Sequence, residues 1–133
     1  MIGLVIVSHS ARLAQGVHEL AVQMAGEQVC ISLAGGLSDD CETLGTDAQR
    51  VLTAIEEAWC EDGVLLLMDV GSAVMSAEIA LEMLPEARRR NCLLSNAPLV
   101  EGAVVAALHA SMGEPLQVVN AQAEAALSAP KLG

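Results

Sequence analysis

Four short, continuously apolar runs alternate with longer segments of helical periodicity, and this alternation restricts the chain to very few folds. The apolar runs span residues 4–7, 29–33, 64–68 and 92–94. Each run is apolar throughout and not at every second residue, which is typical of a strand in a parallel sheet that is covered on both faces. The segments between and after them repeat apolar residues every three or four positions, as amphipathic helices do. The sequence therefore predicts an α/β fold with a mainly parallel sheet.

The helical segments are defined by their apolar stripes. The stripes consist of Leu13, Val17, Leu20, Ala21 and Met24; of Ala48, Val51, Leu52, Ile55 and Trp59; of Val74, Ala77, Leu81 and Leu84; and of Val100, Ala103, Val104, Ala107, Leu108 and Ser111. A last helix is expected from near Pro115, which suits a first helical turn, to about Leu127. Because only 1% of the residues are aromatic, the core must be aliphatic, and Met68, Met75 and Met83 are expected in it.

Capping residues support these helix boundaries. Thr46 followed by Gln49 has the spacing of a capping box for the second helix. Ser72 is expected to cap the third helix, and Asn96 with Pro98 to open the fourth.

The strand order follows from the handedness of the connections. Right-handed crossovers in a doubly wound, flavodoxin-like arrangement give the order 2-1-3-4, with helices on both faces. The winding then reverses between strands 1 and 3, and ligands of such sheets bind beyond the carboxyl ends of the strands at the reversal. We expect one domain over residues 1–127 and a tail over residues 128–133. The candidate site therefore consists of the residues that follow Val7 and Met68.

A histidine and an aspartate follow these two strands. Residues 8–12 read SHSAR and residues 69–73 read DVGSA. We expect His9 and Asp69 to lie in one cleft, beside two helix N-termini whose backbone N–H groups and dipoles favour an anion. Gly71 has no Cβ to obstruct the approach of a ligand to the backbone.

The residue types suggest a histidine nucleophile. An imidazole is largely neutral near pH 7 and has one ring nitrogen available to attack, while Asp69 on the other nitrogen would fix the tautomer and stabilise positive charge on the ring of His9. Arg12 could neutralise an incoming phosphoryl group, and Thr46 could donate to it. From the residues alone, a helix-capping His9, a turn-forming Asp69 and a purely capping Thr46 remain alternatives.

The charge balance limits the possible partners. Seventeen acidic against six basic residues give a formal charge of −11. This argues against binding to nucleic acid or to an anionic membrane and favours a basic partner surface. The chain contains no apolar run near the roughly 20 residues of a membrane span, and its N-terminus lacks the charged segment of a signal peptide.

Cysteine and histidine usage predicts neither disulfides nor a metal centre. The four cysteines are Cys30, Cys41, Cys60 and Cys92. They form no CxxC pair and no cluster with histidine, so we expect reduced thiols in a cytoplasm and no bound metal. His18 and His109 are interpreted as helix residues that are either solvated or satisfied by hydrogen bonds.

At these residues the sequence resembles a known family. Residues 4–17, LVIVSHSARLAQGV, resemble the opening of the DhaM family, the phosphotransfer subunits of phosphotransferase-system-dependent dihydroxyacetone kinases. Residues 45–48, 68–73 and 97–102 match further blocks in the same order, and the resemblance covers residues 1–127. The domain of this family is similar to the mannose-type IIA domain of sugar permeases, which shares the α/β fold and the histidine after strand 1.

The resemblance implies a phosphoryl carrier. Phosphate would pass from phosphoenolpyruvate through enzyme I and phospho-HPr to His9, and then to ADP held by the nucleotide-binding kinase subunit, while a third subunit binds dihydroxyacetone covalently. Asp69 would orient His9, and Gly71, Ser72 and Thr46 would contact the phosphoryl group. The resemblance also implies a homodimer and no permanently bound cofactor. Some members carry HPr-like and enzyme-I-like domains after this one, so HPr should be a separate protein here unless the chain is a fragment.

Three other functions remain compatible with the residues. The first is a mannose-type permease IIA domain that passes phosphate to a IIB domain. The second is a small tetrapyrrole metal chelatase, although its chemistry requires a second histidine where this chain has Asp69 to Ser72. The third is a binding or regulatory module that makes no chemical use of His9.

Overall fold

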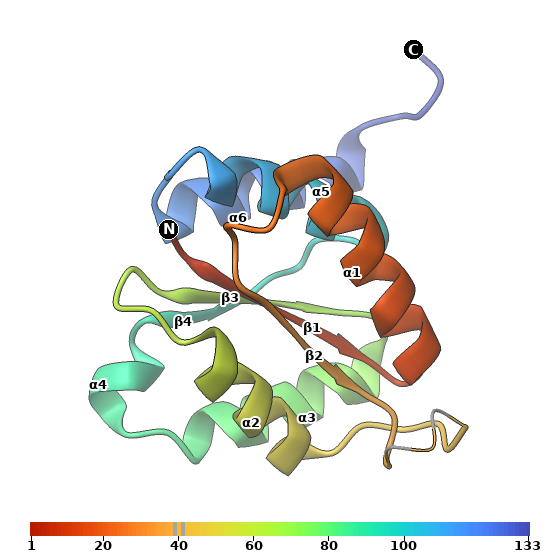
Figure 1. Ribbon diagram of the computed structural model, residues 1–133, viewed down its shortest axis with the longest axis vertical. Coiled ribbons are helices and arrows are strands. Elements are labelled where there is room, and N and C mark those ends of the chain that lie inside the picture. Colours follow the sequence, from red (N-terminus) through yellow and green to blue (C-terminus); the bar gives the residue numbers. More distant parts are fainter. Residues whose placement is uncertain (39, 41) are drawn as a thin grey trace.

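The predicted alternation of strands and helices is present in the computed structural model, which describes residues 1–38, 40 and 42–133 (Figure 1). In chain order the elements are β1 (Gly3–Ser8), α1 (Ala11–Ala25), β2 (Ile31–Gly35), α2 (Ala48–Ala58), β3 (Val64–Met68), α3 (Gly71–Glu82), α4 (Glu86–Arg89), β4 (Cys92–Leu94), α5 (Leu99–Ser111), α6 (Leu116–Glu124) and a 3-10 turn (Ala125–Ser128). The last predicted helix corresponds to α6 and this turn. Within the described ranges, no helix is long and apolar enough to cross a membrane.

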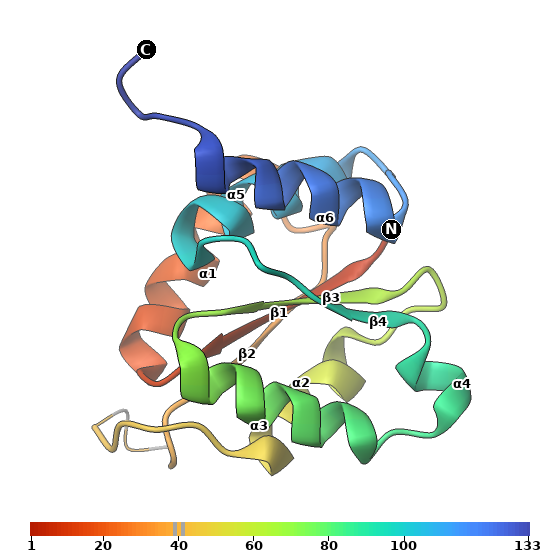
Figure 2. The same cartoon turned by 180° about the vertical axis from the view of Figure 1, so that it is seen from behind.

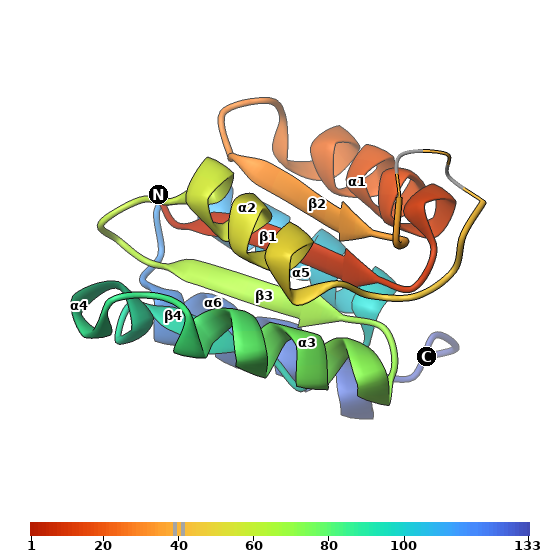
Figure 3. The same cartoon turned by 90° about the horizontal axis from the view of Figure 1, so that it is seen from below.

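The four strands form one parallel sheet in the order β2-β1-β3-β4, which confirms the predicted topology. Val5 in β1 lies between Ser32 of β2 and Leu66 of β3. Helices α1, α5 and α6 cover one face of the sheet and α2 and α3 the other (Figures 1 and 2). The carboxyl ends of β1 and β3 lie side by side where the winding reverses (Figure 3).

Burial differs between the central and the outer strands. Every residue of β1 and β3 is buried, as the continuous apolar runs predicted. The same prediction is wrong for the outer strands, because burial alternates along β2 and β4 is only half-buried. The reason is their position: β2 and β4 each pair with a strand on one side only.

The helices pack through small side chains, which corrects the predicted stripe of α1. The buried residues of this helix are Ala14, Val17, Ala21 and Ala25. Leu13, Leu20 and Met24 are instead 41%, 45% and 51% exposed. Because alanine allows the close approach of α1 to α5, the larger side chains lie on the flank of the helix. Met75 of α3 and Met83, which directly follows this helix, are likewise exposed, contrary to their expected place in the core, whereas Met68 is buried.

Asp47, and not Thr46, caps α2. The Asp47 carboxylate accepts a hydrogen bond from the Gln49 N–H at 3.1 Å. The predicted capping box of Thr46 and Gln49 is therefore wrong, because α2 begins one residue later and Asp47 alone caps it as the preceding residue. The Thr46 side chain is left to contact α3.

Of the other two predicted caps, Ser72 is wrong, whereas the prediction for α5 holds for Pro98 and not for Asn96. Helix α3 begins at Gly71 after an extended Val70 without a side-chain cap, so Ser72 lies inside its first turn. Helix α5 begins directly after Pro98, and the Asn96 N–H donates instead to the Glu124 carboxylate at 2.8 Å. Proline can precede a helix in this way because its fixed φ suits the helix start.

The described cysteines are free thiols. Cys30, Cys60 and Cys92 form no disulfide, and Cys41 lies outside the described residues. Burial raises the pKa of the Cys92 thiol to about 11, although Arg88 nearby has a smaller lowering effect.

Candidate active site

His9 and Asp69 meet at the carboxyl ends of β1 and β3, as the sequence predicted. The ring Nδ1 of His9 lies 2.9 Å from Oδ1 of Asp69. The His9 side chain is 26% exposed and that of Asp69 12%, so the ring remains accessible while the carboxylate is largely covered. Because a carboxylate only accepts hydrogen bonds, Nδ1 carries the hydrogen and Nε2 keeps its lone pair.

The Asp69 carboxylate is held by the backbone as well as by the ring. Oδ2 accepts hydrogen bonds from the His9 N–H and from the Ser8 hydroxyl, both at 2.9 Å. Oδ1 also accepts from the Val70 N–H at 2.7 Å. Partial burial alone would raise the pKa of Asp69, but the hydrogen bonds from His9, Val70 and Ser8 outweigh it and lower the pKa below its ordinary value. Asp69 is therefore a fixed anion in the neutral range.

Ser72 faces the other nitrogen of the ring. Its hydroxyl is hydrogen-bonded to Nε2 of His9, and it lies in the first turn of α3. The backbone N–H groups of Gly71 and Ser72 have no acceptor within the helix, and the helix dipole makes this end attractive to an anion. A Cβ added to Gly71 would meet nothing within 4 Å, so the space above this turn is open. The arrangement can therefore receive an anionic group on Nε2.

The loop before α2 borders the same site. The Gly45 N–H donates to the His9 carbonyl oxygen at 2.8 Å. Gly45 has φ near +140°, and a Cβ there would lie 2.8–3.0 Å from Leu37 side-chain atoms, so this close turn requires glycine. Thr46 Oγ1 lies 2.6 Å from Ser76 Oγ and donates to the Ser72 carbonyl at 3.4 Å. The loop thereby connects the His9 backbone to α3.

The structure does not place Arg12 against the other predicted site residues. Its guanidinium is 72% exposed and lies 3.9 Å from the Glu42 carboxylate. The described residues show no hydrogen bond between Arg12 and His9, Asp69 or Ser72. Any contact with a phosphoryl group would require the side chain to turn away from Glu42.

Sequence reasoning missed one supporting residue, Ser8, and did not foresee that Glu114 pairs with His109. Ser8 is fully buried at the end of an otherwise apolar strand, and its Oγ accepts from the Ser10 N–H at 3.0 Å while donating to Asp69. A lone serine inside an apolar strand was the available signal. His109 Nδ1 lies 2.6 Å from Glu114, at the opposite end of the molecule, which agrees with its interpretation as a solvated or hydrogen-bonded helix residue. Within the described residues, no group of three or more His, Cys, Asp or Glu could hold a metal ion.

The sequence of this chain is similar to a protein-family model and to curated proteins. The family model EIIA-man, described as the PTS system fructose IIA component, matches residues 3–120. The phosphoryl donor subunit DhaM of the PEP-dependent dihydroxyacetone kinase of Providencia stuartii is 45% identical over 130 residues, covering 97% of this chain and 27% of that protein. The subunit of the same name from Escherichia coli K12 is 46% identical over 132 residues, covering 98% and 28%. The chain thus spans little more than a quarter of the length of these relatives.

One shorter relative and one solved structure match this chain over most of both lengths, and a second solved structure shares the fold alone. The phosphoryl donor subunit DhaM of PEP-dependent dihydroxyacetone kinase 2 from Listeria innocua is 39% identical, covering 81% of this chain and 85% of that protein. The crystal structure of the unknown function protein EF1359 superposes with a TM-score of 0.84 at 37% identity and covers 100% and 98% of the two chains. The dihydroxyacetone kinase from C. freundii shares only the fold, with a TM-score of 0.61 at 18% identity over 96% and 25%. The chain therefore belongs to the EIIA-man family of the phosphotransferase system, among its DhaM phosphotransfer subunits.

Proposed function

We propose that this chain is a phosphoryl carrier that accepts phosphate from phospho-HPr on Nε2 of His9 and donates it to ADP in a nucleotide-binding subunit of dihydroxyacetone kinase. The observation that carries the proposal is the orientation of one imidazole: Nδ1 bound to Asp69, and Nε2 turned to the open N-terminus of α3. The printed names of the relatives as phosphoryl donor subunits support the same role.

The first transfer uses the lone pair on Nε2. This pair attacks the phosphorus of the donor's phosphohistidine, a new N–P bond forms and the old N–P bond breaks, leaving its electron pair on the donor's ring. Positive charge then develops on the ring of His9, and the Asp69 carboxylate at 2.9 Å stabilises it. In the second transfer a terminal phosphate oxygen of ADP attacks the phosphorus, and the N–P electron pair returns to Nε2.

Groups around Nε2 have distinct parts in these steps. The Ser72 hydroxyl must turn from Nε2 to a phosphoryl oxygen when the N–P bond forms, and the Gly71 and Ser72 N–H groups can donate to the same anion. Thr46 supports Ser72 through its backbone carbonyl, so its contribution is to position this turn. Arg12 would join only after leaving Glu42.

The remaining expectations are part of the same proposal. We place the protein in a cytoplasm, as a homodimer with no permanently bound cofactor, because its phosphate would be carried covalently on His9. Steering towards basic partner surfaces would follow from the formal charge of −11. The chelatase alternative needs a second histidine facing the first, whereas Ser72 occupies that place.

The decisive experiment supplies the protein with phosphoenolpyruvate, enzyme I and HPr. An acid-labile phosphate adduct on His9 is expected, absent from His9→Gln and dependent on HPr. The labelled protein is then offered either the ADP-loaded kinase subunit or a mannose-type IIB domain. Transfer to the ADP-loaded subunit supports the proposal, transfer to the IIB domain alone replaces it with the permease role, and an unlabelled His9 in the wild type overturns both.

A further inference from the structure

Asp69, His9 and Ser72 are joined in series by hydrogen bonds through the two nitrogens of one ring. Oδ1 of Asp69 accepts from Nδ1 of His9 at 2.9 Å, and the Ser72 hydroxyl is hydrogen-bonded to Nε2. Because Nδ1 carries the ring hydrogen, Nε2 is the acceptor and the Ser72 hydroxyl is the donor. The serine proton is therefore directed at a basic nitrogen whose ring is held by a carboxylate. This is the order of groups in a Ser-His-Asp catalytic triad, which is recognised by geometry and roles and not by sequence position.

The backbone around Ser72 also suits a nucleophile. Ser72 follows the buried strand β3 after a short turn and lies in the first turn of α3. Serine nucleophiles of many hydrolases lie at a strand-to-helix turn, because the turn presents the hydroxyl at the end of the sheet. The N–H groups of Gly71 and Ser72 have no acceptor within the helix, so they can stabilise an oxyanion that forms beside the hydroxyl.

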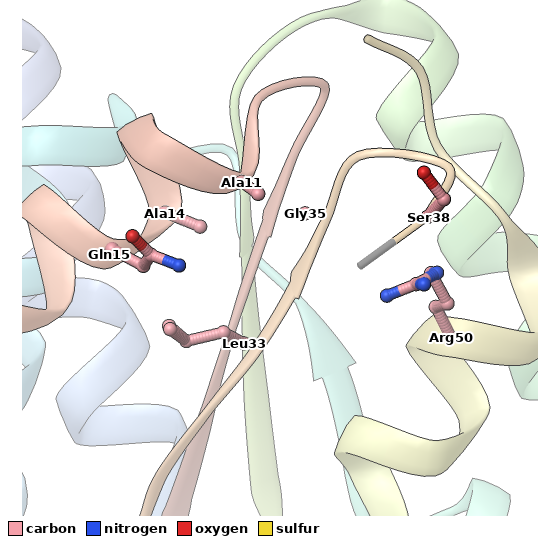
Figure 4. A pocket seen from close by; sticks show the side chains of 7 residues that line it. All are labelled: Ala11, Ala14, Gln15, Leu33, Gly35, Ser38 and Arg50. Atoms are coloured by element: carbon pink, nitrogen blue, oxygen red, sulfur yellow. The ribbon is translucent and has the colours of Figure 1, made fainter. Parts of the chain in front are cut away.

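The surroundings of the hydroxyl restrict the substrates. Ser72 is exposed, and a Cβ added to Gly71 would meet nothing within 4 Å, so a carbonyl group can approach from solvent. The hollow of about 210 Å³ in Figure 4 lies beside β2, where Leu33 and Gly35 line it and neither Ser72 nor His9 does. This hollow therefore does not enclose an acyl group on Ser72. Small esters with a good leaving group fit such a site, because they need little binding energy from the acyl chain.

We propose that the protein in its unphosphorylated state also hydrolyses small activated esters, with Ser72 as the nucleophile, His9 as the general base and Asp69 orienting the ring. This activity goes beyond the proposed phosphoryl transfer, although both reactions use Nε2 of His9. Phosphate on Nε2 would occupy the lone pair that the Ser72 proton needs, so the two reactions exclude each other in time.

The reaction proceeds in two halves, acylation and hydrolysis. In the first, the Ser72 oxygen attacks the ester carbonyl carbon while Nε2 of His9 takes the hydroxyl proton. A C–O bond forms, and the carbonyl electron pair moves to the oxygen that faces the N–H groups of Gly71 and Ser72. The bond to the leaving oxygen then breaks, and this oxygen takes the proton from His9. Water attacks the acyl ester on Ser72 by the same route, which releases the carboxylic acid and restores the hydroxyl.

A second histidine–carboxylate pair of this chain provides an internal comparison. Nδ1 of His109 lies 2.6 Å from Glu114, but the hydroxyl of the nearby Ser111 donates to the Leu108 carbonyl at 2.6 Å. The Ser111 hydroxyl is thus engaged by the helix backbone. Chemistry that an imidazole carries out alone would be open to both histidines, whereas chemistry of the triad requires Ser72.

Covalent labelling with a fluorophosphonate tests the nucleophile. The reagent forms an O–P bond to an activated serine and releases fluoride, while the base takes the hydroxyl proton. Peptide mass spectrometry should locate the adduct on Ser72, and Ser72→Ala and His9→Gln should each slow labelling at least about tenfold. Ser111→Ala and His109→Gln should label like the wild type. An unlabelled wild type, or an adduct on His9 or on another serine, would overturn the proposal.

Hydrolysis of p-nitrophenyl acetate tests turnover and the substrate class. The wild type should release nitrophenolate at least about tenfold faster than Ser72→Ala. An unchanged rate in Ser72→Ala would mean that the imidazole reacts alone, and it would reject the triad. The hexanoate ester should be hydrolysed no faster than the acetate, and a faster hexanoate would contradict the assigned substrate class.

A measurement on the wild type keeps the test valid if a variant fails to fold. The labelling rate at each pH should follow the fraction of neutral His9 measured by NMR in the same sample, because only the neutral ring accepts the Ser72 proton. A labelling rate independent of this fraction would contradict the role of His9 as the base. The assays contain no phosphoenolpyruvate, enzyme I or HPr, so the esterase can fail while phosphoryl transfer stands, and the reverse.

Discussion

Asp69 accepts hydrogen bonds from four donors, and only one of them is the histidine ring. The others are the His9 N–H, the Val70 N–H and the Ser8 hydroxyl. The carboxylate is thus positioned by the ends of β1 and β3 whether or not the ring is present. This explains how a side chain on a separate strand can fix the tautomer of His9, as the proposed phosphoryl carrier requires.

Replacing Asp69 by asparagine should slow phosphorylation of His9 by about 10²–10⁴-fold. An amide presents an NH₂ group to donors that need an acceptor, and it can hold the ring in the tautomer whose hydrogen is on Nε2. That tautomer has no lone pair at the attacking nitrogen. The measurement is the initial rate of label transfer from phospho-HPr. Glu114→Gln is the matched control, because it disrupts the His109–Glu114 pair at the opposite end and should leave the rate unchanged.

The lowered pKa of Asp69 also predicts an acid dependence of stability. A carboxyl whose pKa is lower in the folded than in the unfolded chain stabilises the fold above its unfolded pKa, about 4, and this contribution is lost as pH falls through the folded value. Asparagine does not titrate. The difference in unfolding free energy between wild type and Asp69→Asn should therefore be largest near neutral pH and shrink below about pH 4. Urea titrations across this range measure it, and a constant difference would refute the assignment.

The sequence predicts which residues lie at the strand ends, but it does not predict their hydrogen-bond partners. His9 and Asp69 could be placed together because each directly follows a buried strand, and parallel strands end at one edge. The contacts of Thr46 depend on a loop that crosses from β2 to α3, and no local pattern encodes that path. Arg12 could be placed on the first turn of α1, but the residue that its guanidinium contacts, Glu42, lies thirty residues later and could not be predicted.

At the element scale, hydrophobic periodicity predicts a helix, but it does not determine which of two adjacent helix faces is buried. Helix α1 carries leucines and a methionine on one face and alanines on the next. A hydrophobicity pattern favours the larger side chains, whereas the close contact with α5 selects the alanines. The edge position of β2 has the same origin, because strand order and not strand sequence decides which strands lack a second neighbour.

The two glycines beside His9 should respond differently to alanine. At Gly45, φ near +140° and contacts of 2.8–3.0 Å to Leu37 make a Cβ costly, so Gly45→Ala should lower the unfolding free energy by about 1–3 kcal/mol. At Gly71 a Cβ meets nothing within 4 Å, so Gly71→Ala should leave stability within about 0.5 kcal/mol. Urea denaturation gives both values.

Phosphorylation assays distinguish the same two variants further. If Gly71 leaves space for the phosphoryl group, Gly71→Ala should slow transfer although the fold is intact. Unchanged transfer in this variant would assign Gly71 a structural role only. Equal stability of the two variants would show that the loop before α2 tolerates a side chain at Gly45.

At the scale of the whole molecule, two of the six basic residues contact other parts of the fold. The Arg88 guanidinium lies 4.8 Å from the Trp59 ring centre, and Arg89 donates to the carbonyls of Leu81 and Leu84 at the end of α3. These contacts give Arg88 and Arg89 a structural role. The formal charge of −11 already includes these exposed arginines, so an approaching protein meets a net acidic molecule.

Electrostatic steering should make phosphoryl transfer sensitive to salt. Salt should change the rate of association with the donor protein and not the rate of the transfer step itself. Screening shortens from about 30 Å at 0.01 M to about 8 Å at 0.15 M ionic strength. Over that range kcat/KM for phospho-HPr should fall about tenfold, with kcat nearly constant, because screened charges act on association more than on the bound complex. Glu42→Lys, in the loop beside the site, and Glu86→Lys, in α4 at the other end, change the formal charge equally. If the charge near His9 steers the donor protein, Glu42→Lys should lower kcat/KM several-fold more than Glu86→Lys. Equal effects of the two variants would mean that only the net charge of the chain affects association.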